Sequence, residues 1–143
     1  MSTGSWRVTS LHHVAIAHGD DPVCEDAMMM FLGAPAHAEH GPGFLERMFP
    51  VGGSFVQTLE AEGDGLVQRF LDRRGPGLHH VAFAVDAIDA ALADLAARGV
   101  SLIDQEARPG GMGTRIAFLH PSSTGGVLIE LVEDEEEVRA RHG

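Results

Sequence analysis

The sequence predicts an α+β fold made of two similar halves, each with a β-strand, then an α-helix, then two or three further strands. Three observations carry this prediction. Residues 11–17 return as residues 78–84 with a single substitution, a stretch of helical spacing follows each copy, and each half closes with an alternating run. Self-similarity of this kind indicates a repeated structural unit.

Apolar residues recur at helical spacing after each copy of the repeat. In the first half the spaced residues are Val23, Ala27, Met28, Phe31 and Leu32. In the second half they are Ile88, Ala91, Leu92, Leu95 and Ala96. Asp86 is the predicted N-cap of the second helix, and Gly33 and Gly99 are the predicted ends of the two helices.

Each half ends in a predicted strand with alternating character. The two runs are residues 55–60 and 128–133, and the glycine pairs at 52–53 and 125–126 predict the turns that precede them. When the runs are aligned, Gln57 falls on Glu130. Both halves therefore place a polar side chain at the same position of an otherwise apolar strand face.

The repeat also predicts the organisation of the chain. We expect an N-terminal extension (1–8), a first module (9–62), a linker with a short helix (63–77), a second module (78–134) and an acidic, charged tail (135–143). The tail has no apolar periodicity, so it is expected to be frayed and solvated.

Composition narrows the classes of function. The 143 residues carry a formal net charge of -11, which leaves no basic face for a nucleic acid. No apolar stretch approaches the roughly 20 residues that span a bilayer, so no membrane partner is expected and a cytoplasmic location is predicted. The single cysteine, Cys24, cannot form an internal disulfide and is expected to be an ordinary buried residue.

The alternation of side chains along a strand predicts which polar residues face inward. His13 shares a strand face with Ala15 and Ala17, and His80 occupies the same place in the second half. A pseudo-two-fold relation between the halves would bring together His13, Gln57, His80 and Glu130. Two imidazoles, an amide oxygen and a carboxylate suit a divalent ion such as Co, Mn, Ni, Fe or Zn. The alternative for each histidine is a hydrogen-bonded core residue without a metal.

These residues resemble the vicinal oxygen chelate (glyoxalase/bleomycin resistance/dioxygenase) superfamily and, within it, the methylmalonyl-CoA epimerase family. The resemblance covers about residues 9–134 and is most specific in segments 75–82, 86–89, 113–121 and 126–131. It implies two tandem βαβββ modules, a glyoxalase-like fold whose curled sheets form a cleft around one metal. By the family pattern the metal ligands match His13, Gln57, His80 and Glu130, and cobalt is the favoured ion.

The resemblance also implies an activity. It is a metal-dependent epimerisation of methylmalonyl-CoA, or of a similar 2-substituted malonyl-type acyl-CoA, by two-base proton transfer through a metal-stabilised enolate. Glu46 and Glu130 would alternate as general base and acid, and Arg115 would bind the substrate; a homodimer is also expected. The alternatives are a solvent-facing Glu46 beside Arg47, and an Arg115 that pairs with a surface acid.

The first half departs most from the family pattern, because its loops are shorter. Four histidines are expected to be solvated loop or tail residues: His18, His37, His40 and His142. Other functions of the same scaffold stay open. They are a glyoxalase-like lyase or isomerase, a dioxygenase acting on another carbonyl substrate, and a non-catalytic ligand-binding protein.

Overall fold

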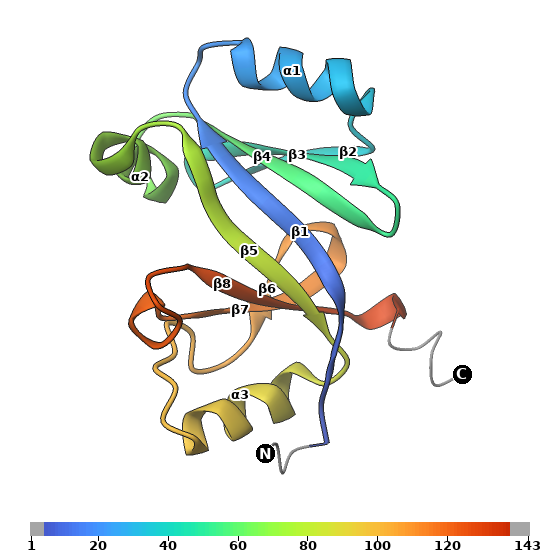
Figure 1. Ribbon diagram of the computed structural model, residues 1–143, viewed down its shortest axis with the longest axis vertical. Helices are drawn as coiled ribbons and strands as arrows, with labels where there is room; N and C mark the ends of the chain where they lie inside the picture. Colours follow the sequence, from blue (N-terminus) through green and yellow to red (C-terminus); the bar gives the residue numbers. More distant parts are fainter. Residues whose placement is uncertain (1–4, 138–143) are drawn as a thin grey trace. The chain divides into compact units, whose positions relative to one another are not determined.

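The computed structural model describes residues 5–137 (Figure 1). These residues divide into two compact units. One unit comprises His13–His80, and the other comprises the described residues up to His12 and from Val81 onward. Strands β1 (Val8–His18) and β5 (Gly77–Val85) each contribute residues to both units. Residues 138–143 of the predicted tail lie outside the described part of the chain.

The unit His13–His80 contains a strand series in the order β2-β3-β4-β1. Its further elements are α1 (Val23–Leu32), β2 (His37–Gly41), β3 (Phe44–Val51), β4 (Ser54–Ala61) and α2 (Leu66–Arg74). Strand β4 pairs in parallel with β1 and antiparallel with β3, which in turn pairs antiparallel with β2. The turn between β3 and β4 begins at Gly52, whose φ of 57° favours glycine, as predicted.

The other unit repeats this pattern with the strand series β5-β8-β7-β6. Its further elements are α3 (Ile88–Ala97), β6 (Arg108–Pro109), β7 (Thr114–Leu119), β8 (Ile129–Asp134) and two 3-10 turns at Gly111–Gly113 and Pro121–Ser123. Strand β8 pairs in parallel with β5 and antiparallel with β7. In chain order each half is βαβββ, with α2 between the halves, so the predicted fold class is confirmed.

The strand registers are equivalent in the two halves. Gln57 on β4 is the Cα partner of Ala15, two residues after His13. Glu130 on β8 is the Cα partner of Ala82, two residues after His80. The predicted alignment of Gln57 with Glu130 is therefore a structural equivalence, with each residue beside the strand that carries a histidine of the repeat.

Helix boundaries agree with the prediction, but the start of α3 is stabilised differently. The residue that precedes α3 is Ala87, and the carboxylate of Asp86 accepts a hydrogen bond from the Arg7 backbone at 2.8 Å. The Ile88 N–H donates instead to Glu133 on β8, at 2.7 Å. The predicted Asp86 cap is wrong, because the Asp86 carboxylate bonds to Arg7 and the first N–H of the helix bonds to Glu133.

Each unit has its own apolar core. In the unit His13–His80, Ala15, Ala17 and Leu59 pack against Val67 and Phe70 of α2. In the other unit, a larger cluster joins α3 to strands β7 and β8 through Ile88, Ala91, Leu92, Ala117, Leu119 and Leu131. The free thiol of Cys24 is half-buried. Among the described residues, no helix is long and apolar enough to cross a membrane.

Candidate functional site

Two buried imidazoles face each other in the unit His13–His80. His13 lies on β1 and His80 lies near the start of β5. The two residues are 4% and 6% exposed. Their Nε2 atoms lie 3.0 Å apart. At most one proton fits between two such nitrogens, so a lone pair is directed into this gap. Paired imidazole nitrogens of this kind are suitable ligands for a divalent metal ion.

Gln57 places an oxygen donor on the neighbouring strand. Its position on β4 lies between Ala15 of β1 and Met48 of β3, and the side chain is buried. The amide Nε2 donates a hydrogen bond to Glu46, so the orientation of the amide is set. The opposite atom, Oε1, is buried without a hydrogen-bond partner among the described residues. Burying an unsatisfied carbonyl oxygen is costly, and a bound cation would remove that cost. The donor set thus fits a metal.

Glu46 is a buried acid with a second acid beside it. It lies on β3, 7% exposed, and is the cross-strand partner of Glu39 on β2. Burial, and then the hydrogen bond and negative charge of Glu39, raise the pKa of Glu46 above its ordinary value of 4.5. Glu39 in turn contacts His37, whose Nε2 lies 2.7 Å from a Glu39 oxygen. A buried carboxyl group that keeps its proton more readily than usual is suited to acid–base catalysis.

Glu130 is the corresponding buried acid of the other unit. It lies on β8, 5% exposed, between Ala82 of β5 and Phe118 of β7. Ile116 and Val132 lie on the same apolar face and pack against Ala82. A carboxylate among such neighbours is unfavourable unless it has a compensating charge or hydrogen bonds. The predicted convergence of Glu130 with the three side chains of the first unit stays a prediction.

Arg115 is engaged in ion pairs on the α3 side of its unit. Its guanidinium lies 2.8 Å from Asp89 and 3.4 Å from Glu133. The alternation of β7 sets Arg115 on the opposite face to Ile116 and Phe118, which are the residues on the face of Glu130. The structure therefore does not bring Arg115 toward Glu130, and its contact with a substrate stays a prediction.

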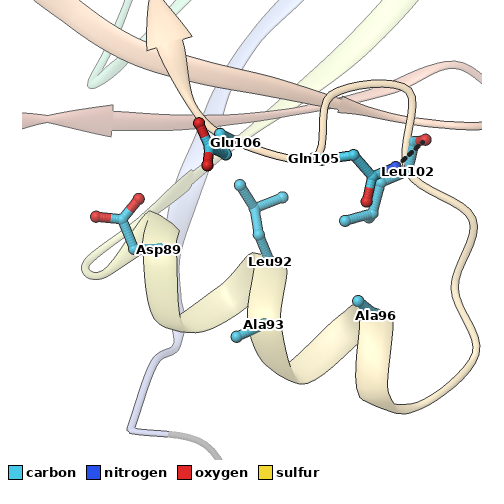
Figure 2. Close-up of a pocket in the computed structure, with 7 residues that line it drawn as sticks. All are labelled: Asp89, Leu92, Ala93, Ala96, Leu102, Gln105 and Glu106. Carbon is cyan, nitrogen blue, oxygen red and sulfur yellow. Dashed lines mark hydrogen bonds between the residues drawn. The ribbon is translucent and has the colours of Figure 1, made fainter.

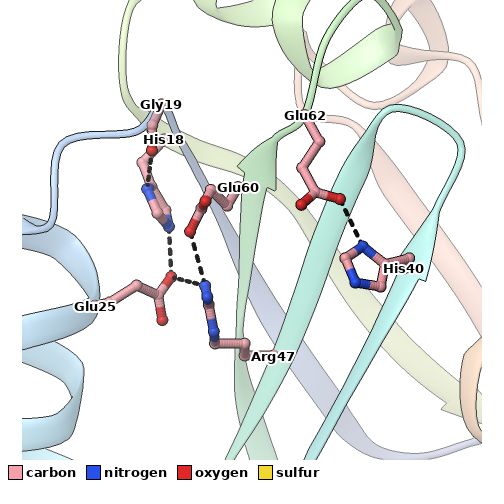
Figure 3. Close-up of polar contacts among 7 residues, drawn as sticks. All are labelled: His18, Gly19, Glu25, His40, Arg47, Glu60 and Glu62. Carbon is pink, nitrogen blue, oxygen red and sulfur yellow. Dashed lines mark hydrogen bonds and ion pairs between the residues drawn. The ribbon is translucent and has the colours of Figure 1, made fainter.

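A polar network that the sequence did not predict joins α1 to three strands (Figure 3). His18, predicted to be solvated, is 3% exposed and hydrogen-bonded to Glu25 of α1. Arg47 joins the network at 3.2 Å from Glu25 and 3.0 Å from Glu60. The prediction for His18 is wrong because β1 continues to this residue. The missed signal is that His18 extends the alternating face of Val14 and Ile16.

Two other histidines that were predicted to be solvated, His37 and His40, lie within the described residues, whereas His142 lies outside them. His40 is largely exposed, and its Nδ1 lies 2.6 Å from a carboxylate oxygen of Glu62. Figure 3 shows this pair apart from the network of His18. His37 is only partly exposed, because it belongs to strand β2 rather than to a loop.

A pocket in the other unit lies between α3 and the segment that follows it (Figure 2). Its lining consists of Asp89, Leu92, Ala93, Ala96, Leu102, Gln105 and Glu106. The lining contains none of the predicted site residues. The lining also contains no histidine, so it lacks the imidazole ligands of the candidate metal site, and the candidate site is not here.

The comparisons with known proteins agree with this description. Residues 12–118 match the model of the glyoxalase/bleomycin resistance protein/dioxygenase superfamily. The mitochondrial methylmalonyl-CoA epimerase of Bos taurus is 33% identical over 133 residues, covering 88% of this chain and 75% of the relative. The crystal structure of methylmalonyl-CoA epimerase from Mycobacterium tuberculosis is 35% identical with a TM-score of 0.84, covering 98% of this chain and 96% of that one. A methylmalonyl-CoA epimerase in complex with methylmalonyl-CoA and NH4+ is 34% identical with a TM-score of 0.83, covering 90% and 96% of the two chains.

These similarities define the class of the protein. The chain belongs to the glyoxalase/bleomycin resistance protein/dioxygenase superfamily, as its repeated βαβββ halves indicate. Within that superfamily it belongs to the methylmalonyl-CoA epimerase family, and so to the isomerases.

Proposed function

We propose that the protein is a metal-dependent epimerase of methylmalonyl-CoA or of a similar 2-substituted malonyl-type acyl-CoA. Family membership supports the substrate class, since a relative has been solved with methylmalonyl-CoA. The observation that carries the proposal is the arrangement around Gln57. A buried amide oxygen without a partner and two facing imidazoles lie in one unit of a chain of this family.

The proposed ligands of the metal are His13, Gln57, His80 and Glu130. The first three come from the unit His13–His80, and Glu130 is the structural equivalent of Gln57 in the other half. Co, Mn, Ni, Fe and Zn all suit this donor set, and the family resemblance favours cobalt. When bound, the ion supplies positive charge that stabilises the oxygen of an enolate.

Inversion of a carbon next to a thioester needs a proton to leave on one side and another to arrive on the other side. Glu46 and Glu130 are the proposed acid–base pair for these two transfers. The raised pKa of Glu46 supports its part, because a carboxyl group that retains a proton can return it to the substrate. Gln57 orients the Glu46 carboxylate through its amide N–H.

The donor set weighs against one other function, and Glu46 weighs against a second. An iron dioxygenase uses two histidines and one carboxylate, and Gln57 would be an additional ligand in such a site. A non-catalytic binding protein has no use for Glu46, a buried carboxyl group with a raised pKa. The homodimer and the cytoplasmic location stay predictions from the sequence.

The test is exchange of the α-proton of methylmalonyl-CoA in deuterated water, followed by NMR. We expect metal-stripped protein to be inactive, and added cobalt or manganese to restore exchange. Glu46→Gln and Glu130→Gln should each slow inversion by at least about 100-fold, whereas Glu106→Gln, at an exposed acid of the other unit, should not. A protein that binds the metal tightly without exchanging the proton would contradict the proposed substrate.

A further inference from the structure

The histidine that precedes His80 has a ring position fixed by its neighbours. The His79 ring lies 4.9 Å from the ring of Phe70, at an interplanar angle of 57°. Phe70 belongs to the buried cluster that includes α2, and the Arg74 guanidinium also lies over the Phe70 ring, 5.9 Å from the ring centroid. His79 is therefore packed against the core of its unit and is not a freely rotating surface side chain.

From this position His79 contacts the Nδ1 atom of His80. The two Nδ1 atoms are 2.8 Å apart, a hydrogen-bond distance that requires a proton on one of them. The other nitrogen of His80, Nε2, is the atom that faces His13. The two contacts thus use the two ring nitrogens of His80 for different partners.

The protonation of one nitrogen determines what the other can do. A neutral imidazole that binds a metal through Nε2 must carry its hydrogen on Nδ1. An acceptor at Nδ1 favours that tautomer and also holds the ring plane. For His80 this acceptor would be the Nδ1 lone pair of His79, which would then carry its own hydrogen on Nε2.

We propose that His79 is a positioning residue, which accepts a hydrogen bond from the Nδ1–H of His80 and so directs the His80 Nε2 lone pair toward His13. The inference rests on the proposed metal site, and adds to it a residue that does not touch the metal. Outer hydrogen-bond partners of metal ligands commonly alter metal affinity by about 10–100-fold.

Two substitutions of His79 separate the hydrogen bond from the ring packing. His79→Phe keeps a ring against Phe70 but has no acceptor. His79→Asn removes the ring but keeps an acceptor oxygen. If the hydrogen bond matters, the dissociation constant for cobalt should rise about tenfold or more in His79→Phe, while His79→Asn should stay closer to the wild type. His120→Ala, in the other unit, is the control.

The second readout is the tautomer of His80 in metal-free protein, measured by nitrogen-15 NMR of labelled histidine at mildly alkaline pH. We expect the Nδ1–H form in wild type and in His79→Asn, and a shift toward the Nε2–H form in His79→Phe. An unchanged tautomer in His79→Phe would overturn the inference, as would a loss of cobalt affinity in His79→Asn alone or equally in both variants. Absence of cobalt binding by wild type would refute the metal site, whereas the tautomer measurement would still test the hydrogen bond.

Discussion

Gln57 donates its amide N–H to Glu46, and this single contact fixes the direction of both of its polar atoms. The nitrogen is turned to the proposed acid–base residue, so the oxygen is left for another ligand. One side chain thus links the two functions proposed for the site, metal binding and proton transfer. Substitutions at Glu46 and at Gln57 should therefore affect these two functions separately.

The first prediction concerns Glu46→Gln. General acid–base catalysis by a positioned side chain contributes typically about 10²–10⁴-fold, so we expect inversion of the substrate to slow by at least about 100-fold. Cobalt affinity should stay near that of the wild type, because Glu46 is not a proposed ligand. NMR time courses that start from each epimer separately measure the rate of inversion. Titration of metal-stripped protein with cobalt measures the affinity.

The two epimers provide the internal control for this variant. In a two-base mechanism the remaining base still removes the proton of one epimer, so deuterium exchange without inversion should persist for that epimer alone. Equal loss of exchange from both epimers, with the metal in place, would count against Glu46 as one of two bases.

The second prediction concerns Gln57→Ala, which removes the amide oxygen. The dissociation constant for cobalt should rise by about tenfold or more, equivalent to about 1.4 kcal/mol. Calorimetric titration of metal-stripped protein measures the change. Gln68→Ala on α2 is the matched control, since Gln68 bonds only to the exposed Asp72 among the contacts described for it. Equal affinities of the Gln57 and Gln68 variants would exclude Gln57 as a ligand.

Much of this site follows from strand periodicity. A period of two predicts that His13, Gln57, His80 and Glu130 face inward, and all four are buried. The repeat then predicts that Gln57 and Glu130 are equivalent, and the strand registers agree. These inferences succeed because local alternation and the duplicated order of strands determine them.

Side-chain contacts between distant segments could not be predicted from these local patterns. Asp86 has the residue type and position of an N-cap, yet Glu133 from a later strand takes that role. His18 looks like a loop residue in isolation, but its partner Glu25 lies on the next helix and Arg47 on a later strand. Side-chain pairing across elements depends on how the elements pack, which a local pattern does not encode.

The third prediction concerns the pH dependence of stability. The hydrogen bond from His18 to Glu25 raises the pKa of His18 above 6.5. Burial pushes the pKa of Glu25 up, but His18, the hydroxyl of Thr58 and the charge of Arg47 together outweigh burial and leave the pKa below 4.5. His18 therefore contributes fully to the free energy of unfolding below the pKa that it has in the unfolded chain. This contribution is lost as pH rises through its pKa in the folded protein. The contribution of Glu25 to the free energy of unfolding is present above the pKa that Glu25 has in the unfolded chain. It is lost as pH falls through the pKa of Glu25 in the folded protein.

Denaturant unfolding of wild type and His18→Gln across this range tests the pair. The difference in unfolding free energy should be largest at mildly acidic pH and should shrink toward alkaline pH and toward strong acid. His40→Gln is the control, because His40 forms an exposed pair with Glu62 and should show little difference at any pH. A difference that grows with rising pH would contradict the assigned direction.

The fourth prediction concerns Arg115, the residue predicted from the sequence to bind substrate. Its ion pairs with Asp89 and Glu133 are partly exposed, so Arg115→Ala should lower the unfolding free energy by no more than about 1 kcal/mol. Because these acids already hold the guanidinium on the α3 side, we expect KM for methylmalonyl-CoA to stay near the wild-type value. Asp89→Asn is the paired variant, since it weakens the ion pair but keeps Arg115. A raised KM with unchanged kcat in Arg115→Ala, absent from Asp89→Asn, would instead establish the contact with substrate, because that pattern reports lost binding and not lost catalysis.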